Sequence, residues 1–134
     1  MTHSIVNLLD KVNPFLTGKD LIEITLSYEE LTGNAYWLLD MFENGKPTEI
    51  YPLRPDRIKI VPDKKSYIKA YKYDIGNNEW VSFKPEQILH FKYFNSIDDY
   101  YGLSPLSAGR SAVKTQQLGD EYNQNFYLLN LTNL

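Results

Sequence analysis

Ser104 and His90 are the two side chains in this sequence that could supply a nucleophile or a general base. Ser104 lies in the run GLSPL at residues 102–106. A hydrolase nucleophile elbow has the pattern Gly-x-Ser-x-Gly, and the backbone N–H after the serine forms half of the oxyanion hole. Here the second glycine is missing, and Pro105 has no N–H to donate. The run instead predicts a helix start, with Ser104 as the N-cap, Pro105 at the first helical position and Gly102 in a tight turn before it.

A phosphate site at the same helix start is the second chemical possibility, because helix N-termini attract anions. The sequence contains neither a Walker A pattern nor a dinucleotide-binding glycine pattern. The nearest cation, Arg110, follows nearly two turns later, and the adjacent acids Asp98 and Asp99 would repel a phosphate. Adjacent acids, here and at Glu29 and Glu30, do not face each other on a helix or strand, so neither pair predicts a catalytic dyad.

The two histidines, His3 and His90, have no partner at a spacing typical of a metal site. His90 is flanked by Leu89 and Phe91, which predicts a partly buried histidine in a strand. The chain has no cysteine, which excludes disulfides, thiolate metal sites and cysteine catalysis. We therefore expect no catalytic residue, cofactor or metal site.

Net charge and composition limit the kinds of partner that this chain could bind. The formal net charge is −3, and no basic run exceeds Lys64-Lys65. This argues against tight binding of duplex DNA, which normally requires a basic stripe. It does not exclude a protein that encloses DNA without gripping it. No stretch approaches the ~18 uninterrupted apolar residues of a membrane span, so no membrane partner is expected.

The elements that would position these residues follow from periodicity. Apolar residues at helical spacing predict helices over about 3–12 and 18–32, the second ending at Gly33. Between about 35 and 94 the chain predicts antiparallel strands, including hairpins at an Asn-Gly turn and at a Gly-Asn-Asn turn. A single α+β unit over residues 1–134 is the simplest summary.

A long C-terminal helix over about 104–132 completes this expectation. Small and then bulky residues recur at spacings of 4 and 3 along it, and Tyr122 and Phe126 lie in the bulky half. Such a helix would be on the order of 40 Å long. It could lie across its own sheet or pack against a neighbour, and the sequence leaves both open. The chain ends without a helix cap or a polar tail, so we expect a fragment of a longer polypeptide.

Several stretches together resemble the portal proteins of long-tailed bacteriophages. They are, in order, LLDKVNPFLTGKDLIE, LTGNAYWLL, IYPLRPDRIKI, EQILHFKYF, YYGLSPLSAGRSAV and EYNQNFY. No single motif is specific, but the ordered set covers nearly the whole chain. The resemblance makes these residues candidates for structural motifs or interfaces: Gly33, Asn34, Tyr36, Pro55, Asp56, Arg57, His90, Tyr101, Gly102, Ser104, Pro105, Tyr122 and Phe126.

The resemblance implies a structural role and no enzymatic activity. A portal is a ring, usually of twelve subunits, at one capsid vertex of the virion, and double-stranded DNA passes through its channel without sequence-specific binding. Its partners are the terminase, capsid or scaffolding proteins and head–tail connector proteins, and it assembles in the bacterial host cytoplasm. The matched part would be the outer, wing-type region of a longer subunit. Two alternatives remain: a small enzyme domain with a serine or histidine site, and another head–tail adaptor.

Overall fold

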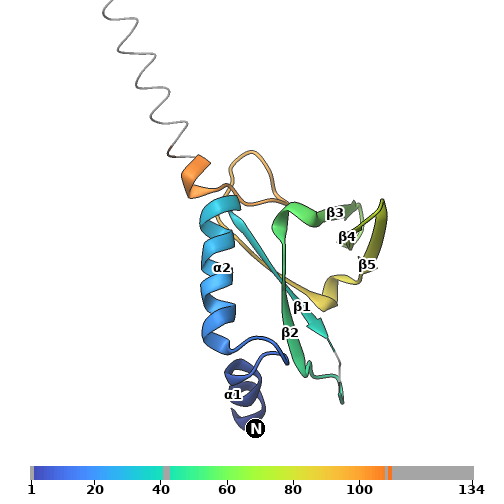
Figure 1. Ribbon diagram of the computed structural model, residues 1–134. Helices are drawn as coiled ribbons and strands as arrows, with labels where there is room; N and C mark the ends of the chain where they lie inside the picture. The colour runs from blue at the N-terminus through green and yellow to red at the C-terminus, as the bar shows by residue number, and fades with distance from the viewer. Residues whose placement is uncertain (1, 41–42, 108, 110–134) are drawn as a thin grey trace, which may run out of the picture.

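Two small antiparallel sheets and two helices make up the fold (Figure 1). The computed structural model describes residues 2–40, 43–107 and 109, with side chains from residue 6 onward. The helices are α1 (Thr2–Asp10) and α2 (Gly18–Thr32). The strands are β1 (Asn34–Asp40), β2 (Glu49–Leu53), β3 (Ile58–Asp63), β4 (Tyr67–Gly76), β5 (Glu79–Phe83) and β6 (Ile88–Lys92). The α+β class is therefore confirmed.

The first sheet has the order β2-β1-β6, so β1 is its central strand. Its apolar and aromatic residues on both faces are typical of that position. Pro52 lies in β2, an edge strand, where its missing N–H costs no ladder hydrogen bond. The Asn-Gly turn at residues 43–46 joins the two strands as expected, with Asn44 and Gly45 both at positive φ.

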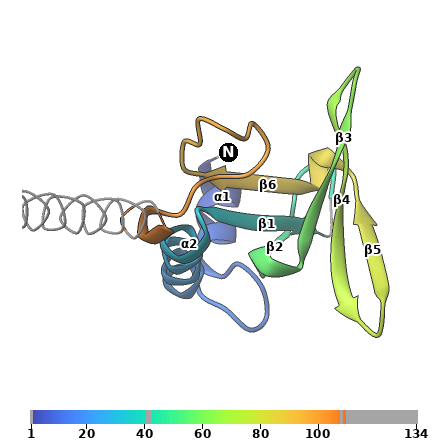
Figure 2. The same cartoon turned by 90° about the horizontal axis from the view of Figure 1, so that it is seen from above.

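The second sheet has the order β3-β4-β5 and contains the second predicted hairpin, β4–β5. Figure 2 shows it at the far end of the molecule from α2. Two short 3-10 helices, Pro55–Arg57 and Pro85–Gln87, carry the chain from one sheet to the other and back. The chain therefore passes from the first sheet to the second after β2 and returns to the first sheet at β6.

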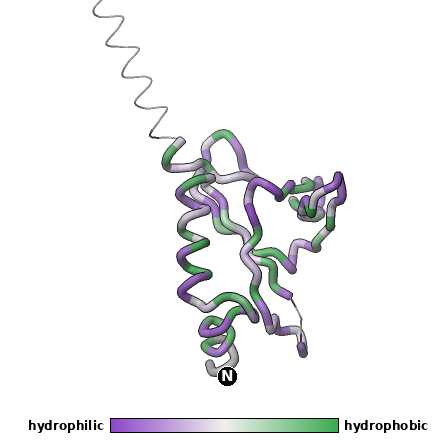
Figure 3. The backbone as a smooth tube through the Cα atoms, in the orientation of Figure 1, coloured by the Kyte–Doolittle hydropathy of each residue, from purple (hydrophilic) through white to green (hydrophobic). Residues whose placement is uncertain are grey.

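Two apolar clusters hold these layers together. Tyr36, Leu53, Ile58, Ile60, Tyr71 and Ile88 form the larger cluster, between the two sheets. Val12, Leu21 and Ile50 form the smaller one, which fixes both helices to the first sheet. Figure 3 shows apolar and polar residues alternating along α2, as expected for a helix with one face on a sheet.

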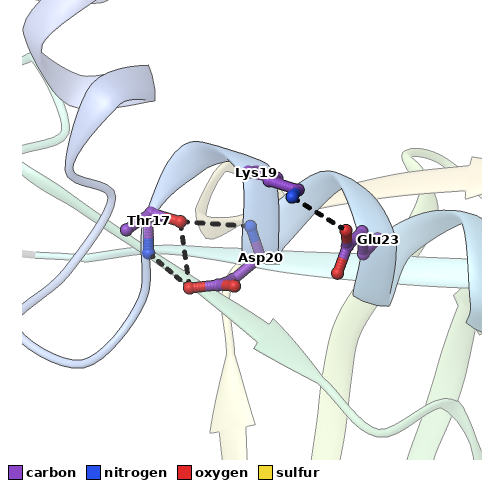
Figure 4. Close-up of polar contacts among 4 residues, drawn as sticks. All are labelled: Thr17, Lys19, Asp20 and Glu23. Carbon is purple, nitrogen blue, oxygen red and sulfur yellow. Dashed lines mark hydrogen bonds and ion pairs between the residues drawn. The ribbon is translucent and has the colours of Figure 1, made fainter.

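Helix α2 begins and ends with specific caps. The Thr17 hydroxyl accepts a hydrogen bond from the Asp20 N–H, and the Asp20 carboxylate accepts one from the Thr17 N–H, forming a capping box (Figure 4). At the other end, Gly33 takes the left-handed conformation with φ of 80°, as the sequence predicted. The helix therefore has the bounds that its cap residues require.

Three predicted boundaries need correction or lie beyond what is described. Helix α1 ends at Asp10 rather than residue 12, and the buried Val12 instead packs against the sheet. Strand β6 ends at Lys92 rather than Phe94, which is 87% exposed. Residues 105–107 and Gly109 are helical, but the rest of the expected long helix, with Tyr122 and Phe126, lies outside the described residues.

Candidate functional site

Asn34 links three segments that are distant in sequence. Its side-chain oxygen accepts hydrogen bonds from the Gly102 N–H at 2.6 Å and from His90 Nε2 at 2.9 Å. Its side-chain nitrogen donates to the Thr32 carbonyl at 3.0 Å and to the Gly102 carbonyl at 3.4 Å. Because the Gly102 N–H can only donate, this network fixes which way the amide points. We call Gly33, Asn34, His90, Gly102 and Ser104 the Asn34 junction.

Two glycines allow the backbones to cross closely at this junction. A Cβ on Gly102 would lie 2.1 Å from the Gly33 carbonyl oxygen, and a Cβ on Gly33 would lie 2.4 Å from the Leu103 carbonyl carbon. The Gly33 carbonyl also accepts a hydrogen bond from the Tyr93 N–H. The end of α2 therefore lies directly against the segment after β6, with no room for a side chain at either glycine.

His90 is a satisfied, partly buried strand histidine, as its flanking residues predicted. Its ring stacks on Tyr36 with centroids 4.2 Å apart. Because the Asn34 side-chain oxygen can only accept, the Nε2 atom carries the proton. Burial lowers the pKa of His90 to about 4, with a smaller contribution from the charge of Lys92. The imidazole is therefore neutral at pH 7.

Ser104 is a helix cap. Its buried hydroxyl accepts a hydrogen bond from the Ser107 N–H at 3.3 Å and donates to the Glu30 carbonyl at 2.9 Å. Pro105 is the first helical residue. The predicted capping role is thus confirmed. The bond to Glu30 adds a function that the sequence did not reveal, since it fixes the new helix start to the last turn of α2.

Tyrosines extend the network from the junction to the second sheet. The Tyr101 hydroxyl oxygen accepts a hydrogen bond from the Ile60 N–H at 2.9 Å, and the Tyr67 hydroxyl donates to the Asp99 carbonyl at 2.7 Å. Tyr36 packs its ring edge-on against Tyr71, with centroids 6.2 Å apart. Burial raises the pKa of Tyr36, which is therefore un-ionised throughout the physiological range. The segment after β6 thus contacts both halves of the fold.

The remaining predicted residues lie apart from the junction. Pro55, Asp56 and Arg57 form the 3-10 helix between β2 and β3, where Asp56 accepts two hydrogen bonds from the Arg54 guanidinium. That pairing lowers the pKa of Asp56. These residues build a connector between the sheets. Tyr122 and Phe126 lie outside the described residues, and their predicted interface role is untested.

The sequence did not identify Glu30, Thr32 or Tyr93 as junction partners. The backbone carbonyls of Glu30 and Thr32 accept hydrogen bonds from Ser104 and Asn34, and the Thr32 hydroxyl bonds to the Asn34 backbone. The Tyr93 N–H donates to the Gly33 carbonyl, and its hydroxyl donates to the Glu30 carboxylate at 2.8 Å. Backbone groups are present at every residue and give no sequence signal. Only the order of the motifs GNAY, LHF and GLSP pointed to this place.

The junction's polar groups satisfy one another. In the described part of the chain, no buried side-chain nitrogen or oxygen lacks a hydrogen-bond partner. Among the same residues there is no cluster of histidine, cysteine or carboxylate side chains that could hold a metal. The described helices are also too short or too polar to span a membrane. Ser104 and His90 bond to different partners, which leaves neither one positioned to activate the other.

Open grooves lie elsewhere on the surface. One, of about 560 Å³, lies between α1 and α2 and is lined by Leu9, Ile22 and Glu23 among others. Another, of about 410 Å³, lies between α1 and the β1–β2 turn. Neither groove includes a residue of the Asn34 junction. The polar side chains of the junction bond to one another and to nearby backbone, which makes the junction a structural element of the fold.

Comparison with known proteins assigns the fold to a family. The family model described as phage portal protein matches residues 1–131. An uncharacterised protein of Rickettsia bellii (strain RML369-C) is 29% identical over 128 residues, covering 92% of this chain and 32% of its own length. A protein of Rickettsia felis (strain ATCC VR-1525 / URRWXCal2) is 28% identical over 125 residues, covering 90% and 30%.

Two solved structures of phage-like particles contain chains with a similar fold. A chain in the neck of an empty gene transfer agent particle, computed with C6 symmetry, superimposes with a TM-score of 0.76 at 30% identity, over 92% of this chain and 34% of that chain. A chain in the neck of the native particle, computed with C12 symmetry, gives 0.74 at 30% identity, over 90% and 34%. This chain spans about a third of the length of these relatives. The chain belongs to the phage portal protein family.

Proposed function

We propose that this chain is a structural part of a portal, the ring at the neck of a phage-like particle through which double-stranded DNA enters and leaves. The observation that carries the proposal is the likeness of the fold, at a TM-score of 0.76, to a chain in the neck of a gene transfer agent particle. The neck structures were computed with C6 and C12 symmetry, which supports a ring of identical subunits for this protein as well.

The chain would form the outer, wing-type part of the subunit. Its span of about a third of its relatives is consistent with one part of a longer protein. The terminase, capsid or scaffolding proteins and head–tail connectors would be its partners in the virion, with assembly in the bacterial cytoplasm. The net charge of −3 favours DNA that slides past the ring over DNA that is held by it.

The geometry does not favour the hydrolase alternative. A serine nucleophile needs a base within hydrogen-bond reach and an oxyanion hole beside it. The Ser104 hydroxyl donates to a backbone carbonyl, and the residue after it is a proline without an N–H. His90 is neutral but donates its Nε2 proton to Asn34. Neither residue is arranged for nucleophilic attack.

Light scattering on the purified full-length gene product tests the proposal. We expect a particle whose mass is a multiple of the subunit mass, near twelve subunits. We also expect no sequence preference when duplex DNA is added at physiological salt. A monomer at all concentrations, or a compact dimer, would contradict the ring. Hydrolysis of a model ester that is lost in a Ser104→Ala variant would favour the enzyme alternative.

A further inference from the structure

Charge is strongly segregated along this chain. Residues 54–84, which contain the second sheet, include eight lysines and arginines but four acids, a net charge of +4. The whole chain has a net charge of −3, so the rest of it is acidic. Helix α2 contains Asp20, Glu23, Glu29 and Glu30 but a single lysine. A basic sheet and an acidic helix therefore coexist in one small fold.

Two of these lysines and one acid, Asp74, lie on the outer face of the second sheet. Strand residues alternate between faces, and Ile58, Ile60 and Tyr71 point into the core. Lys59 and Lys72 are opposite each other on the other face, and the Lys59 ammonium lies 5.1 Å from the centre of the Trp80 ring. Trp80 is 42% exposed. Asp74 is the strand partner of Trp80, so the exposed tryptophan is surrounded by two lysines and one carboxylate. This face keeps a net positive charge and suits an acidic partner with an apolar pocket.

Helix α2 offers such a surface. Leu21 and Thr25 face the sheet, so Ile22, Glu23 and Leu26 lie on the outer side, where Ile22 is 49% and Leu26 55% exposed. The groove of about 560 Å³ between α1 and α2 opens beside Ile22 and Glu23. The two helices pack closely at this groove, since Leu9 and Gly18 both line it and a Cβ on Gly18 would lie 1.8 Å from the Leu9 carbonyl oxygen.

These two surfaces lie at opposite ends of the molecule. Figures 1 and 2 both place α2 at one side and the second sheet at the other, with the first sheet between them. A closed ring needs a heterologous contact, in which one surface of each subunit meets a different surface of the next. Opposite charges on opposite ends satisfy that requirement.

We propose that the outer face of the β3–β4–β5 sheet of one copy docks on the outer face of α2 of the next copy, with Trp80 in the α1–α2 groove and Lys59 near Glu23. The inference rests on the proposed ring, because it names the two surfaces through which neighbouring subunits would meet. The partner is thus a second copy of this chain, and duplex DNA on the same basic face is the competing outcome.

Cysteine cross-linking in the full-length gene product tests the contact, because these 134 residues contain no cysteine. Ser27 is exposed on α2, and Ser82 is exposed on β5 directly opposite Lys72. After oxidation, a mixture of Ser27→Cys and Ser82→Cys proteins should give disulfide-linked pairs that contain one of each. Neither variant alone should give pairs. Pairs of either variant with itself, or no cross-link in the mixture, would overturn the proposal.

Exchanging the charges of Lys59 and Glu23 tests whether these two residues meet in the contact. Lys59→Glu in the Ser82→Cys protein should lower the yield of mixed pairs about tenfold, and Glu23→Lys in the Ser27→Cys protein should restore it. Lys64→Glu, at the β3–β4 turn of the same sheet, makes the same charge change off this face and should leave the yield within about twofold. Loss of cross-linking without restoration would contradict the assigned pair.

Two further outcomes separate this contact from the ring itself. Rings seen by electron microscopy without the Ser27–Ser82 cross-link would overturn the contact and leave the portal proposal standing. Neither rings nor cross-link would overturn both. A duplex DNA gel shift that Lys59→Glu abolishes, with no cross-link in the mixture, would assign the basic face to phosphate binding and overturn the proposal.

Discussion

Asn34 is the residue on which the local architecture depends most. Its one side chain makes four hydrogen bonds, and three of them reach residues 56 and 68 positions away. It therefore connects the end of α2, the strand β6 and the turn before Ser104 in one network. Such a buried network is stabilising when every member is satisfied, and it is costly when one member is removed.

Ser104 gives the clearest single-residue prediction. Ser104→Ala should lower the free energy of unfolding by about 1–2 kcal/mol, because it removes a helix cap and a buried hydrogen bond to the Glu30 carbonyl. Urea denaturation followed by circular dichroism measures this. Ser82→Ala, on an exposed strand position, is the matched control and should change stability by less than about 0.5 kcal/mol. Equal stability of the Ser104 variant and the wild type would contradict the capping role.

His90 predicts a pH dependence with a definite sign. The folded protein keeps His90 neutral down to about pH 4, whereas the unfolded chain takes up the proton near its ordinary pKa of 6.5. Between these values the unfolded state binds more protons. The stabilising contribution of neutral His90 should therefore be fully present above pH 6.5. The free energy of unfolding should fall as the pH decreases from 6.5 towards 4.

Comparison with His90→Gln isolates this contribution, since glutamine can still donate to Asn34 but does not titrate. Urea midpoints measured across the window should fall less steeply in that variant than in the wild type. His3→Gln separates the contribution of the chain's other histidine. An NMR titration of His90 with a midpoint near 6.5 would contradict the account.

At the scale of elements, the crossing of Gly33 and Gly102 sets the angle between α2 and the segment that begins at Ser104. The two backbones approach so closely that neither position has space for a methyl group. The capping box at Thr17 and the left-handed Gly33 fix where α2 starts and stops. The position of Ser104 against the end of α2 is therefore set by backbone contacts rather than by large side chains.

Gly102→Ala tests this crossing. The added Cβ would lie 2.1 Å from the Gly33 carbonyl oxygen and 2.9 Å from the Lys92 Cβ. Because backbone must move to relieve these clashes, we expect a loss of about 2–3 kcal/mol in the free energy of unfolding. Gly109→Ala, with nothing within 4 Å of the added Cβ, should be neutral or stabilising by up to about 1 kcal/mol. Similar behaviour of the two variants would contradict the close crossing.

Local signals in the sequence account for most of the elements. The cap at Gly33, the Asn-Gly hairpin and the Ser104–Pro105 helix start all depend on residues next to them, and all are confirmed. The ends of α1 and β6 were wrong because packing of Val12 and the Tyr93 contact with Gly33 decide them. The division into two sheets and the Asn34 network depend on contacts between distant residues, which periodicity does not encode.

At the scale of the whole molecule, the fold combines an internally satisfied junction with two unlike outer surfaces. The basic face of the second sheet and the acidic face of α2 lie at opposite ends. The family match and the neck structures place this arrangement among proteins of phage-like particles. The proposed structural role is consistent with these features, and Ser104 and His90 are each bonded to other partners.

Cryo-electron microscopy of the full-length gene product tests the central claim most directly. We expect a closed ring with an open centre, in which residues 2–40 and 43–107 of every subunit are folded as described and Asn34 bonds to Gly102 and His90. A single subunit, or a map in which the Ser104 hydroxyl lies beside His90 at a substrate pocket, would contradict it.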